Sequence, residues 1–404
     1  MSVPDGLLFT GSSVAAEAAT DDLTVLRAML TAEVAWVRAQ ERLGLAPAGA
    51  GDGVDRAVSL LSGSDNAAWA LVVRVAREAS GAANPVIPLL ARLRAEVAAV
   101  APGALAAVHA GLTSQDVLDT ALVLVLRDAA ATVSADLTRA AQAAQRLART
   151  HRDDPALAVT LAQAAVPTTL GARIAVWAPG LAAAAGLLDA VGSVLPLAYG
   201  GAAGELGAVA ALAGGDPFPL VEAWGDELGL PVGPGPWHTT RTPFVRVAGA
   251  FAEACAALGH VAGDVLQGTR PGVGELREPA APGRGTSSAM PHKVNPVLSV
   301  LVRRSAIAAP ALVAQVLTAA GLAVDARPDG AWHAEWPALQ QLARHALVAA
   351  AAGAELLEGL HVDPEAARRN LAAALPDADG VGAAPAIVDR VLGALATRAS
   401  EEGS

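Results

Sequence analysis

From Asp116 to His151 the chain reads DVLDTALVLVLRDAAATVSADLTRAAQAAQRLARTH, without one glycine or proline. Apolar residues recur in this stretch at spacings of three and four, which is the period of one face of an α-helix. They are Leu118, Leu122, Val125, Ala129, Val133, Leu137, Ala140, Ala144 and Leu147. A helix of this length extends on the order of 50 Å at the usual rise per residue. The stretch therefore predicts one long helix with an apolar stripe to bury.

Four more apolar stretches can form long helices: Leu170–Val191, Thr242–Leu266, Asn295–Ala319 and Trp336–Leu360. Hydrophobic residues make up 53% of the chain but aromatic residues only 3%, so the aromatic residues that favour strands are scarce. Nothing in the sequence alternates like a βαβ unit. We therefore expect an all-α protein whose long-helix bundle carries more apolar surface than one monomer covers.

The expected organisation is three helical domains. Residues 1–103 form an N-terminal helical domain, in which a first clear helix begins at Asp21 or Asp22, both of which are good N-caps. Residues 104–348 form the central long-helix bundle, and residues 349–404 form a short C-terminal helical domain.

Acidic residues outnumber basic ones, 39 against 28, and the formal net charge is −11. No Lys/Arg-rich run is present, so neither nucleic acid nor an anionic membrane is expected as a partner. A small polyanionic substrate is compatible with this charge, because a few local cations outweigh the average field at short range. The single cysteine, Cys255, excludes an intrachain disulfide and fits a reducing compartment. No signal-peptide pattern is visible, and the most membrane-like run, Ala306–Val324, contains Pro310, so we expect a cytoplasmic protein.

The segment Gly283–Pro296, GRGTSSAMPHKVNP, is rich in glycine and small hydroxyl residues and leads into one of the long helices. Asn295 can cap that helix, with Pro296 at its first position. The free N–H groups of a helix start carry positive potential, to which Lys293 adds a full charge. Together they can hold a carboxylate or stabilise an alkoxide, although composition by itself favours an ordinary flexible connector.

A second polar segment, His109–Asp116 (HAGLTSQD), stands directly before the first long helix. Thr113 and Ser114 place hydroxyl groups at a helix N-terminus, which is a site for anions as well as for ordinary capping. His109 can bind a carboxylate or assist proton transfer, but a lone histidine is more often a satisfied surface or core residue. The residues alone leave both interpretations of this segment open.

Three segments together resemble the conserved blocks of the fumarase/aspartase superfamily. The run SSAMPHKVNP from Ser287 is similar to the signature loop, HAGLTS from His109 to the first block, and VTLAQAAVPTTLG from Val159 to the second. The resemblance implies that Ser287 abstracts a proton from carbon next to a carboxylate and that His109 is also catalytic. It implies substrate-binding roles for Thr113, Ser114, Gln163, Thr168, Arg241, Ser288, Met290, Lys293 and Asn295.

The resemblance also implies an assembly. In this superfamily the central domains of four subunits build a helical core, and each active site combines the three blocks from three different subunits. A homotetramer that acts on a small polycarboxylate without a cofactor or metal is therefore expected. A serine hydroxyl can serve there as a base only where backbone N–H donors and positive potential stabilise it, ideally after a mobile loop has closed.

Weaker matches favour the cycloisomerase branch of the superfamily: Asn84–Pro88, Trp237–Pro243, Val297–Leu301 and Gly330–Trp336. Within the second of these, Arg241 is a possible carboxylate clamp, since its planar fork suits bidentate pairing; a surface salt bridge is the alternative. This branch interconverts 3-carboxy-cis,cis-muconate and 4-carboxymuconolactone, in the protocatechuate branch of the β-ketoadipate pathway. We expect that cofactor-independent reaction, in which a proton is transferred at carbon as the lactone forms or opens.

Three positions depart from the cycloisomerase pattern. Val159 stands where an arginine is usual, Ala164 where a histidine is usual, and Glu205 where a threonine is usual. A Glu205 carboxylate would repel an anionic substrate if it pointed inward, whereas an outward one would simply be solvated. These departures keep two alternatives open: a C–N or C–O lyase acting on a substituted succinate of the adenylosuccinate or nitrosuccinate kind, and a weakly active structural paralogue.

Overall fold

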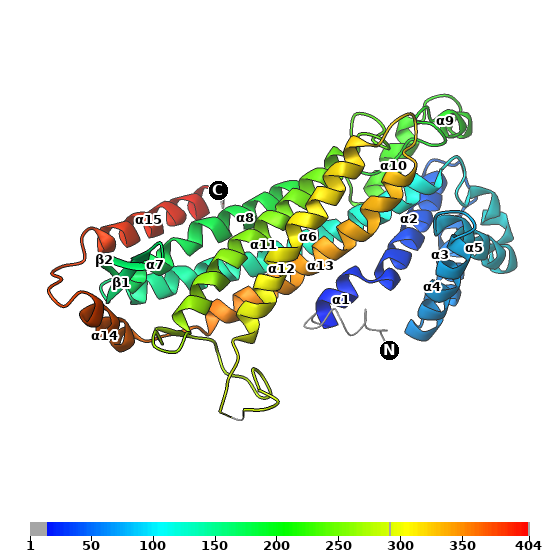
Figure 1. The fold of residues 1–404 in the computed structure, drawn as a ribbon. Helices are drawn as coiled ribbons and strands as arrows, with labels where there is room; N and C mark the ends of the chain where they lie inside the picture. The colour runs from blue at the N-terminus through cyan, green and yellow to red at the C-terminus, as the bar shows by residue number, and fades with distance from the viewer. Residues whose placement is uncertain (1–13, 291, 403–404) are drawn as a thin grey trace. The chain divides into compact units, whose positions relative to one another are not determined.

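A computed structural model describes residues 14–290 and 292–402 of the chain, which are largely α-helical, as predicted (Figure 1). The helices are α1 (Val14–Thr20), α2 (Asp22–Arg42), α3 (Ala50–Ser62), α4 (Asp65–Ala79), α5 (Val86–Val100), η1 (Pro102–Ala107), α6 (Ser114–Thr150), α7 (Leu170–Ala175), α8 (Trp177–Gly192), α9 (Gly207–Ala213), α10 (Phe218–Leu228), α11 (Thr242–Gly268), α12 (Val297–Gly321), α13 (Gly330–Glu358), α14 (Pro364–Ala374) and α15 (Ala384–Glu402). The strands are β1 (Pro155–Thr160), β2 (Gln163–Thr169), β3 (Leu276–Arg277) and β4 (His361–Val362).

The chain divides into two compact units, each made of three stretches. The first unit consists of residues 1–130, 190–249 and 311–344, and the second of residues 131–189, 250–310 and 345–404. The dividing points fall inside long helices. The three domains predicted from the sequence stay a prediction.

The first unit contains the predicted start of the first clear helix. Asp21 is the N-cap of α2, and its carboxylate accepts a hydrogen bond from the N–H of Thr24 at 2.8 Å. Helix α2 packs against α3 and α10 (Figure 1). At the contact with α10, the rings of Trp36 and Trp224 meet edge to face with centroids 5.2 Å apart, and both side chains are fully buried. Such pairs favour one relative orientation of the two helices.

The long helix predicted from Asp116 to His151 is confirmed as α6, which runs over 37 residues from Ser114. Its apolar stripe is buried along most of its length; Leu118, Leu137 and Ala144 are each at most 3% exposed. Because the stripe includes many alanines, neighbouring helices can approach closely. The helix was predictable from the sequence because the helical pattern continues over this whole length without a helix breaker.

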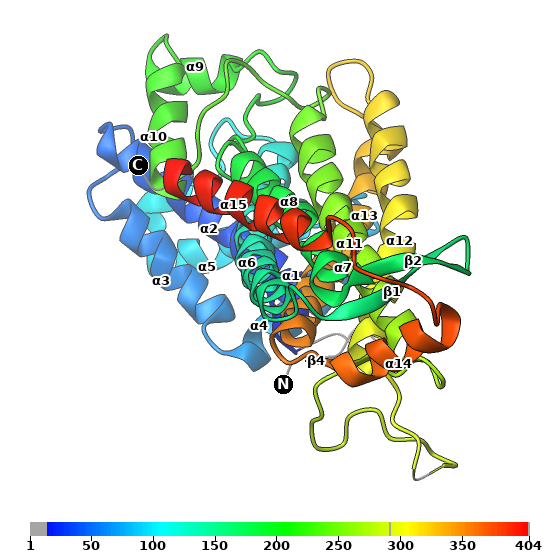
Figure 2. The ribbon, with the colours of Figure 1, turned by 90° about the vertical axis from the view of Figure 1, so that its left-hand side faces the viewer.

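The second unit contains a β-hairpin that the sequence analysis did not predict. Strands β1 and β2 pair antiparallel, and the turn between them consists of Leu161 and Ala162, with φ of 48° and 62°. Two-residue hairpin turns with positive φ normally carry asparagine, aspartate or glycine. Because neither turn residue belongs to that group, the sequence lacked the usual hairpin signal. Helix α14 packs on β1, and α15 lies alongside α7 (Figure 2).

In the part of the chain that the structure describes, three helical stretches are long and apolar enough to cross a membrane, judged by length and composition alone: Leu170–Gly192, Thr242–Gly268 and Val297–Gly321. The third overlaps the run that looked most membrane-like in the sequence. It contains Pro310 within the helix, and large apolar side chains remain exposed on it, including Ile307 at 71%.

Candidate active site

The signature loop lies in the second unit, between β3 and α12. The Oγ atom of Ser287 accepts hydrogen bonds from the backbone N–H groups of Ala289 at 3.4 Å and Met290 at 3.2 Å. Ser287 is half-buried, whereas Ser288 and Met290 are exposed. Two N–H donors directed at one hydroxyl oxygen are the arrangement that stabilises negative charge on it. This local geometry therefore suits Ser287 for the predicted role of base.

A short bridge closes the base of this loop. The backbone N–H and the side-chain amide of Asn295 both donate to the carbonyl oxygen of Gly285, at 2.8 and 3.2 Å. Gly285 has φ of +73°, and a Cβ atom there would lie 2.5 Å from the carbonyl oxygen of Asn295. Glycine is thus required both by the backbone conformation and by the close approach. Lys293 is exposed on the loop.

The start of α12 differs from the expectation of free N–H groups. The helix begins at Val297, two residues after the predicted cap Asn295. The N–H groups of Leu298 and Ser299 donate to the carboxylate of Glu278, at 3.0 and 2.8 Å. This side chain of the same chain therefore fills the position that was expected to attract an anion. Sequence analysis missed Glu278 because no local pattern links it to a helix that starts so much later.

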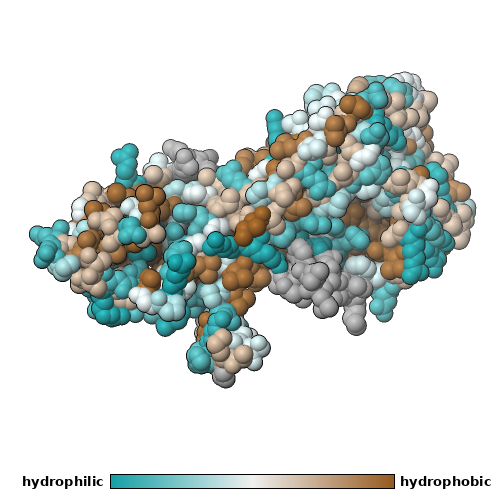
Figure 3. All heavy atoms as spheres, viewed as in Figure 1, coloured by the Kyte–Doolittle hydropathy of each residue, from teal (hydrophilic) through white to brown (hydrophobic). Residues whose placement is uncertain are grey.

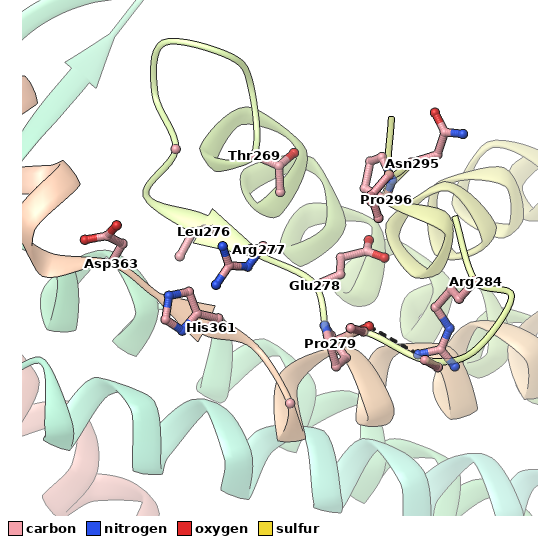
Figure 4. Close-up of a pocket in the computed structure, with 15 residues that line it drawn as sticks. Thr269, Leu276, Arg277, Glu278, Pro279, Arg284, Asn295, Pro296, His361 and Asp363 are labelled. Atoms are coloured by element: carbon pink, nitrogen blue, oxygen red, sulfur yellow. Dashed lines mark hydrogen bonds between the residues drawn. The ribbon is translucent and has the colours of Figure 1, made fainter. Parts of the chain in front are cut away.

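A cavity of about 880 Å³ opens beside this helix start in the second unit (Figure 4). Asn295 lines it, whereas Ser287 and Lys293 do not. Arg277 and His361, cross-strand neighbours in the β3–β4 pair, also line it, and the Arg277 guanidinium points toward His361 (Figure 4). The cavity is large enough for a small polycarboxylate, and the Arg277 guanidinium lines it together with the carboxylates of Glu278 and Asp363.

The second conserved block forms the β1–β2 hairpin of the same unit. Gln163 is exposed and pairs across the strands with Thr160, while Thr168 is half-buried. Val159 and Ala164, the two departures from the cycloisomerase pattern, are directly opposite each other in the register. Directly opposed residues project from the same face of a sheet and interact. The missing cation and the missing imidazole thus leave one continuous apolar patch, in which Val159 is 60% exposed.

The first conserved block lies in the first unit. His109 Nδ1 is 2.5 Å from Oε1 of Glu33, on α2. The N–H of Thr113 donates to the carboxylate of Asp116 at 2.8 Å, and α6 begins at Ser114. Thr113 and Ser114 are half-buried, and both residues stand at the helix start, as predicted from the sequence.

Asp116 organises this block although the sequence analysis gave it no role. Its carboxylate also accepts from Gly201 N at 3.1 Å and contacts His238 Nε2 at 2.8 Å. Asp116 is fully buried, and burial raises the pKa of its carboxyl above the ordinary value despite the neighbouring His238. The contacts join the block to the segment that follows Gly200.

Arg241 lies in a buried ion cluster of the first unit. Its guanidinium donates to Asp119 of α6 at 2.7 Å and to both carboxylate oxygens of Glu335 on α13. All three side chains are at most 2% exposed. Since both sides of the guanidinium fork are already occupied by carboxylates, one of these ion pairs would have to open before Arg241 could bind a substrate. The clamp role remains a prediction; the alternative expected from the sequence was a salt bridge at the surface, whereas the ion pairs of Arg241 are buried.

The cluster holds two carboxylates but one guanidinium, and its hydrogen bonds are unevenly shared. The carboxylate of Asp119 also accepts hydrogen bonds from Trp332 Nε1 at 2.8 Å and from Gln115 Nε2 at 3.1 Å. Among the described residues, the carboxylate of Glu335 accepts hydrogen bonds from Arg241. Burial raises the pKa of Glu335 to about 7, outweighing the attraction of Arg241. Of the two carboxylates in the cluster, Glu335 is therefore the one that binds a proton near neutral pH.

This raised pKa predicts a pH-dependent stability. The folded protein binds the Glu335 proton more tightly than the unfolded chain, so the stabilisation is complete below the unfolded pKa and is lost as pH rises toward about 7. From about pH 4.5 to 8, the free energy of unfolding of the wild type should fall by up to about 3 kcal/mol more than that of Glu335→Gln, as measured by denaturant unfolding. The glutamine variant carries no such titration; parallel curves for the two proteins would contradict the prediction.

Glu205, the third departure, is exposed. Its carboxylate accepts from the N–H of Gly207 at 2.6 Å and so caps the start of α9. Of the two possibilities left by the sequence, the described chain shows the solvated, outward one.

The candidate residues are divided between the two units. His109, Thr113, Ser114 and Arg241 belong to the first, whereas Gln163, Thr168 and the signature loop belong to the second. Within residues 14–290 and 292–402, no three His, Cys, Asp or Glu side chains are grouped so that they could hold a metal ion. The catalytic and binding roles assigned from the sequence stay predictions at this point.

Comparison with known proteins gives the family. A family model described as Lyase matches residues 17–309. The chain belongs to this family, within the fumarase/aspartase superfamily. The lyase family membership agrees with the three blocks on which the resemblance was based, because the match spans all three of them and about the first half of α12.

Relatives of this lyase include enzymes with two different activities. This chain is 45% identical to the nitrosuccinate lyase of Streptomyces davaonensis over 359 residues, which cover 88% of this chain and 74% of the relative. It is 39% identical to the 3-carboxy-cis,cis-muconate cycloisomerase of Bradyrhizobium diazoefficiens, with 89% and 77% covered. The solved structure of the 3-carboxy-cis,cis-muconate lactonizing enzyme from Pseudomonas putida is similar with a TM-score of 0.80 at 30% identity, covering 97% of this chain and 87% of that one.

Proposed function

We propose that this lyase catalyses β-elimination from a succinate that carries a leaving group, with nitrosuccinate as the leading substrate. The observation that carries the proposal is the apolar Val159–Ala164 pair on the β1–β2 hairpin. Carboxymuconate has three carboxylates, whereas nitrosuccinate has two carboxylates and an uncharged nitro group. A block that lacks one cation and one imidazole suits the substrate with less negative charge. The 45% identity to a nitrosuccinate lyase supports the same choice.

In the proposed reaction Ser287 removes a proton from the carbon next to the one that bears the leaving group. The electrons of that C–H bond form the new double bond, and the leaving group departs with the electrons of its own bond. Nitrosuccinate would thus yield fumarate and nitrite, and the alkoxide form of Ser287 that takes the proton would become the neutral hydroxyl. The N–H groups of Ala289 and Met290 stabilise the serine oxygen before this step.

The negative charge that develops on the substrate needs its own donors. Lys293 and Asn295 of the signature loop are the proposed binding groups on one side, with Thr113 and Ser114 at the start of α6 on another. Gln163 and Thr168 of the hairpin, together with Ser288 and Met290, are proposed to complete the substrate contacts. His109 is proposed as the second catalytic residue.

Lactonisation of 3-carboxy-cis,cis-muconate is the second candidate. The 39% identity to a cycloisomerase and the similarity to the Pseudomonas putida lactonizing enzyme favour it. The chemistry is related, because lactone opening is also a β-elimination, in which a carboxylate is the leaving group. Ser287 would remove the same kind of proton in that direction.

One pair of assays separates the candidates. Purified protein is given nitrosuccinate, with nitrite measured colorimetrically and fumarate by chromatography, and separately given 3-carboxy-cis,cis-muconate, whose ultraviolet absorbance is lost on lactonisation. Nitrite and fumarate in equal amounts support the leading proposal. Turnover of carboxymuconate alone replaces it with the cycloisomerase. Turnover of neither, by protein that is folded, favours a weakly active structural paralogue.

We also propose that the active form is a cytoplasmic homotetramer, with each site shared between subunits and with neither nucleic acid nor membrane as a partner. Helix α12 supports an assembly because Val300, Ile307 and Leu317 on it are 52%, 71% and 51% exposed. Apolar residues appear where Figure 1 draws this helix (Figure 3). Sedimentation equilibrium should give four times the chain mass of 40.2 kDa; a monomer would contradict the proposal.

A further inference from the structure

We propose that Glu33 is a positioning residue for His109: it holds the Nδ1–H of the imidazole ring and leaves Nε2 as the atom that meets the substrate. This inference rests on the proposed function, which makes His109 catalytic. It adds a residue of α2, outside the three conserved blocks on which the family resemblance was based.

The contact is short and enclosed. Oε1 of Glu33 lies 2.5 Å from Nδ1 of His109, and the two side chains are 3% and 10% exposed. The other carboxylate oxygen, Oε2, is buried and has no hydrogen-bond partner among the residues that the structure describes. A carboxylate buried on α2 with a single partner depends on that partner, because an unpaired buried charge is very costly.

Helix α2 holds the whole segment around His109. Gln40 donates to the carbonyl oxygen of Ala107 at 2.8 Å, and Trp36 donates through Nε1 to that of Ala110 at 3.0 Å. With Glu33, these residues recur at intervals of three and four and therefore share one face of the helix. The same face thus holds the backbone on both sides of His109 and the ring itself.

The backbone at His109 is also unusual. Its φ is 60°, a left-handed conformation that a residue other than glycine adopts at a cost. Such strain persists only where the surrounding contacts fix it, and it is frequent at functional sites. Here the fixing contacts are those of α2. The segment is therefore held in one conformation that presents the histidine ring in a set direction.

The contact determines which ring nitrogen carries the fixed proton. An ionised carboxylate can only accept, so Nδ1 must donate to Glu33. Nε2 has no partner within the described parts of the chain, and it is then the nitrogen free to bind a carboxylate or to exchange a proton. On other elements, the charged side chains that hydrogen-bond to the segment are Arg94 of α5, which donates to the Val108 carbonyl at 3.2 Å, and Asp116 of α6, which accepts from the N–H of Thr113.

The test combines a spectrum with kinetics. Protein labelled with 15N-histidine is sedimented and studied by magic-angle-spinning NMR without substrate, with the His109 signals assigned by comparison with His109→Gln. The wild type should show Nδ1 protonated, and Glu33→Gln should lose that state in favour of a mixture. The same substitution should lower kcat about 10- to 100-fold while KM changes less than about threefold. Glu33→Asp should recover most of the lost kcat.

The control is Gln40→Leu, which removes another tether from the same face of α2 without touching the imidazole. It should lower the melting temperature but leave the His109 spectrum unchanged. If it lowers kcat as much as Glu33→Gln does, or if Glu33→Gln leaves the ring protonation unchanged, the proposal is overturned. The NMR result needs no substrate, so it decides the placement of the ring even if the wild type turns over neither proposed substrate, an outcome that would contradict only the proposed function.

Discussion

Ser287→Ala is expected to lower turnover of the true substrate by about 100-fold or more while leaving the fold and the oligomeric state intact. The physical reason is that the N–H groups of Ala289 and Met290 donate to the serine oxygen and lower the energy of a negative charge on it. Alanine has no side-chain oxygen that could carry this charge. Steady-state kinetics on the substrate identified by the two assays measures the loss, which should lie in kcat.

Thr286→Ala is the matched control for that substitution. Thr286 is the adjacent hydroxyl residue in the same loop, it is exposed, and its hydroxyl makes one long contact of 3.5 Å to the Gly283 carbonyl. Its removal should change kcat by less than about twofold, as is usual for an exposed side chain away from the reaction. Near-normal turnover in Ser287→Ala would remove the proposed base, and an equal loss in both variants would point to damage of the loop.

Arg241→Met is expected to destabilise the protein by about 3–5 kcal/mol, because it leaves Asp119 and Glu335 buried without their cation. The carboxylates lie at most 1% exposed, so water cannot replace the lost partner. The guanidinium also lies 4.9 Å from the centroids of the Trp237 and Phe244 rings, a contact that methionine reproduces only in part. Chemical unfolding at a fixed protein concentration measures the change in the free energy of unfolding.

The same substitution at an exposed site, Arg74→Met on α4, should change stability by no more than about 0.5 kcal/mol. This comparison also separates the two roles considered for Arg241. A large loss of stability agrees with the ion cluster, whereas a stable Arg241→Met variant with a raised KM would identify the residue as a substrate clamp.

The sequence by itself determined the helical character of the chain and the position of its signature segments. The run from Asp116 to His151 has a helical period and no helix breaker, so local propensity and apolar patterning agreed and α6 followed. The three conserved blocks, each a short contiguous segment, led to the superfamily that the comparisons confirmed. Local information was sufficient wherever the signal lay within neighbouring residues.

The tertiary structure decided everything that depends on distant partners. Glu278 fills the start of α12, Glu33 pairs with His109 across 76 residues, and Arg241 lies between carboxylates from two other helices. The Val159–Ala164 pair became visible once the hairpin register was known. These contacts arise because folding brings together side chains whose separation along the chain carries no periodic signal, so only the folded geometry can say which charges are already satisfied and which remain for a substrate.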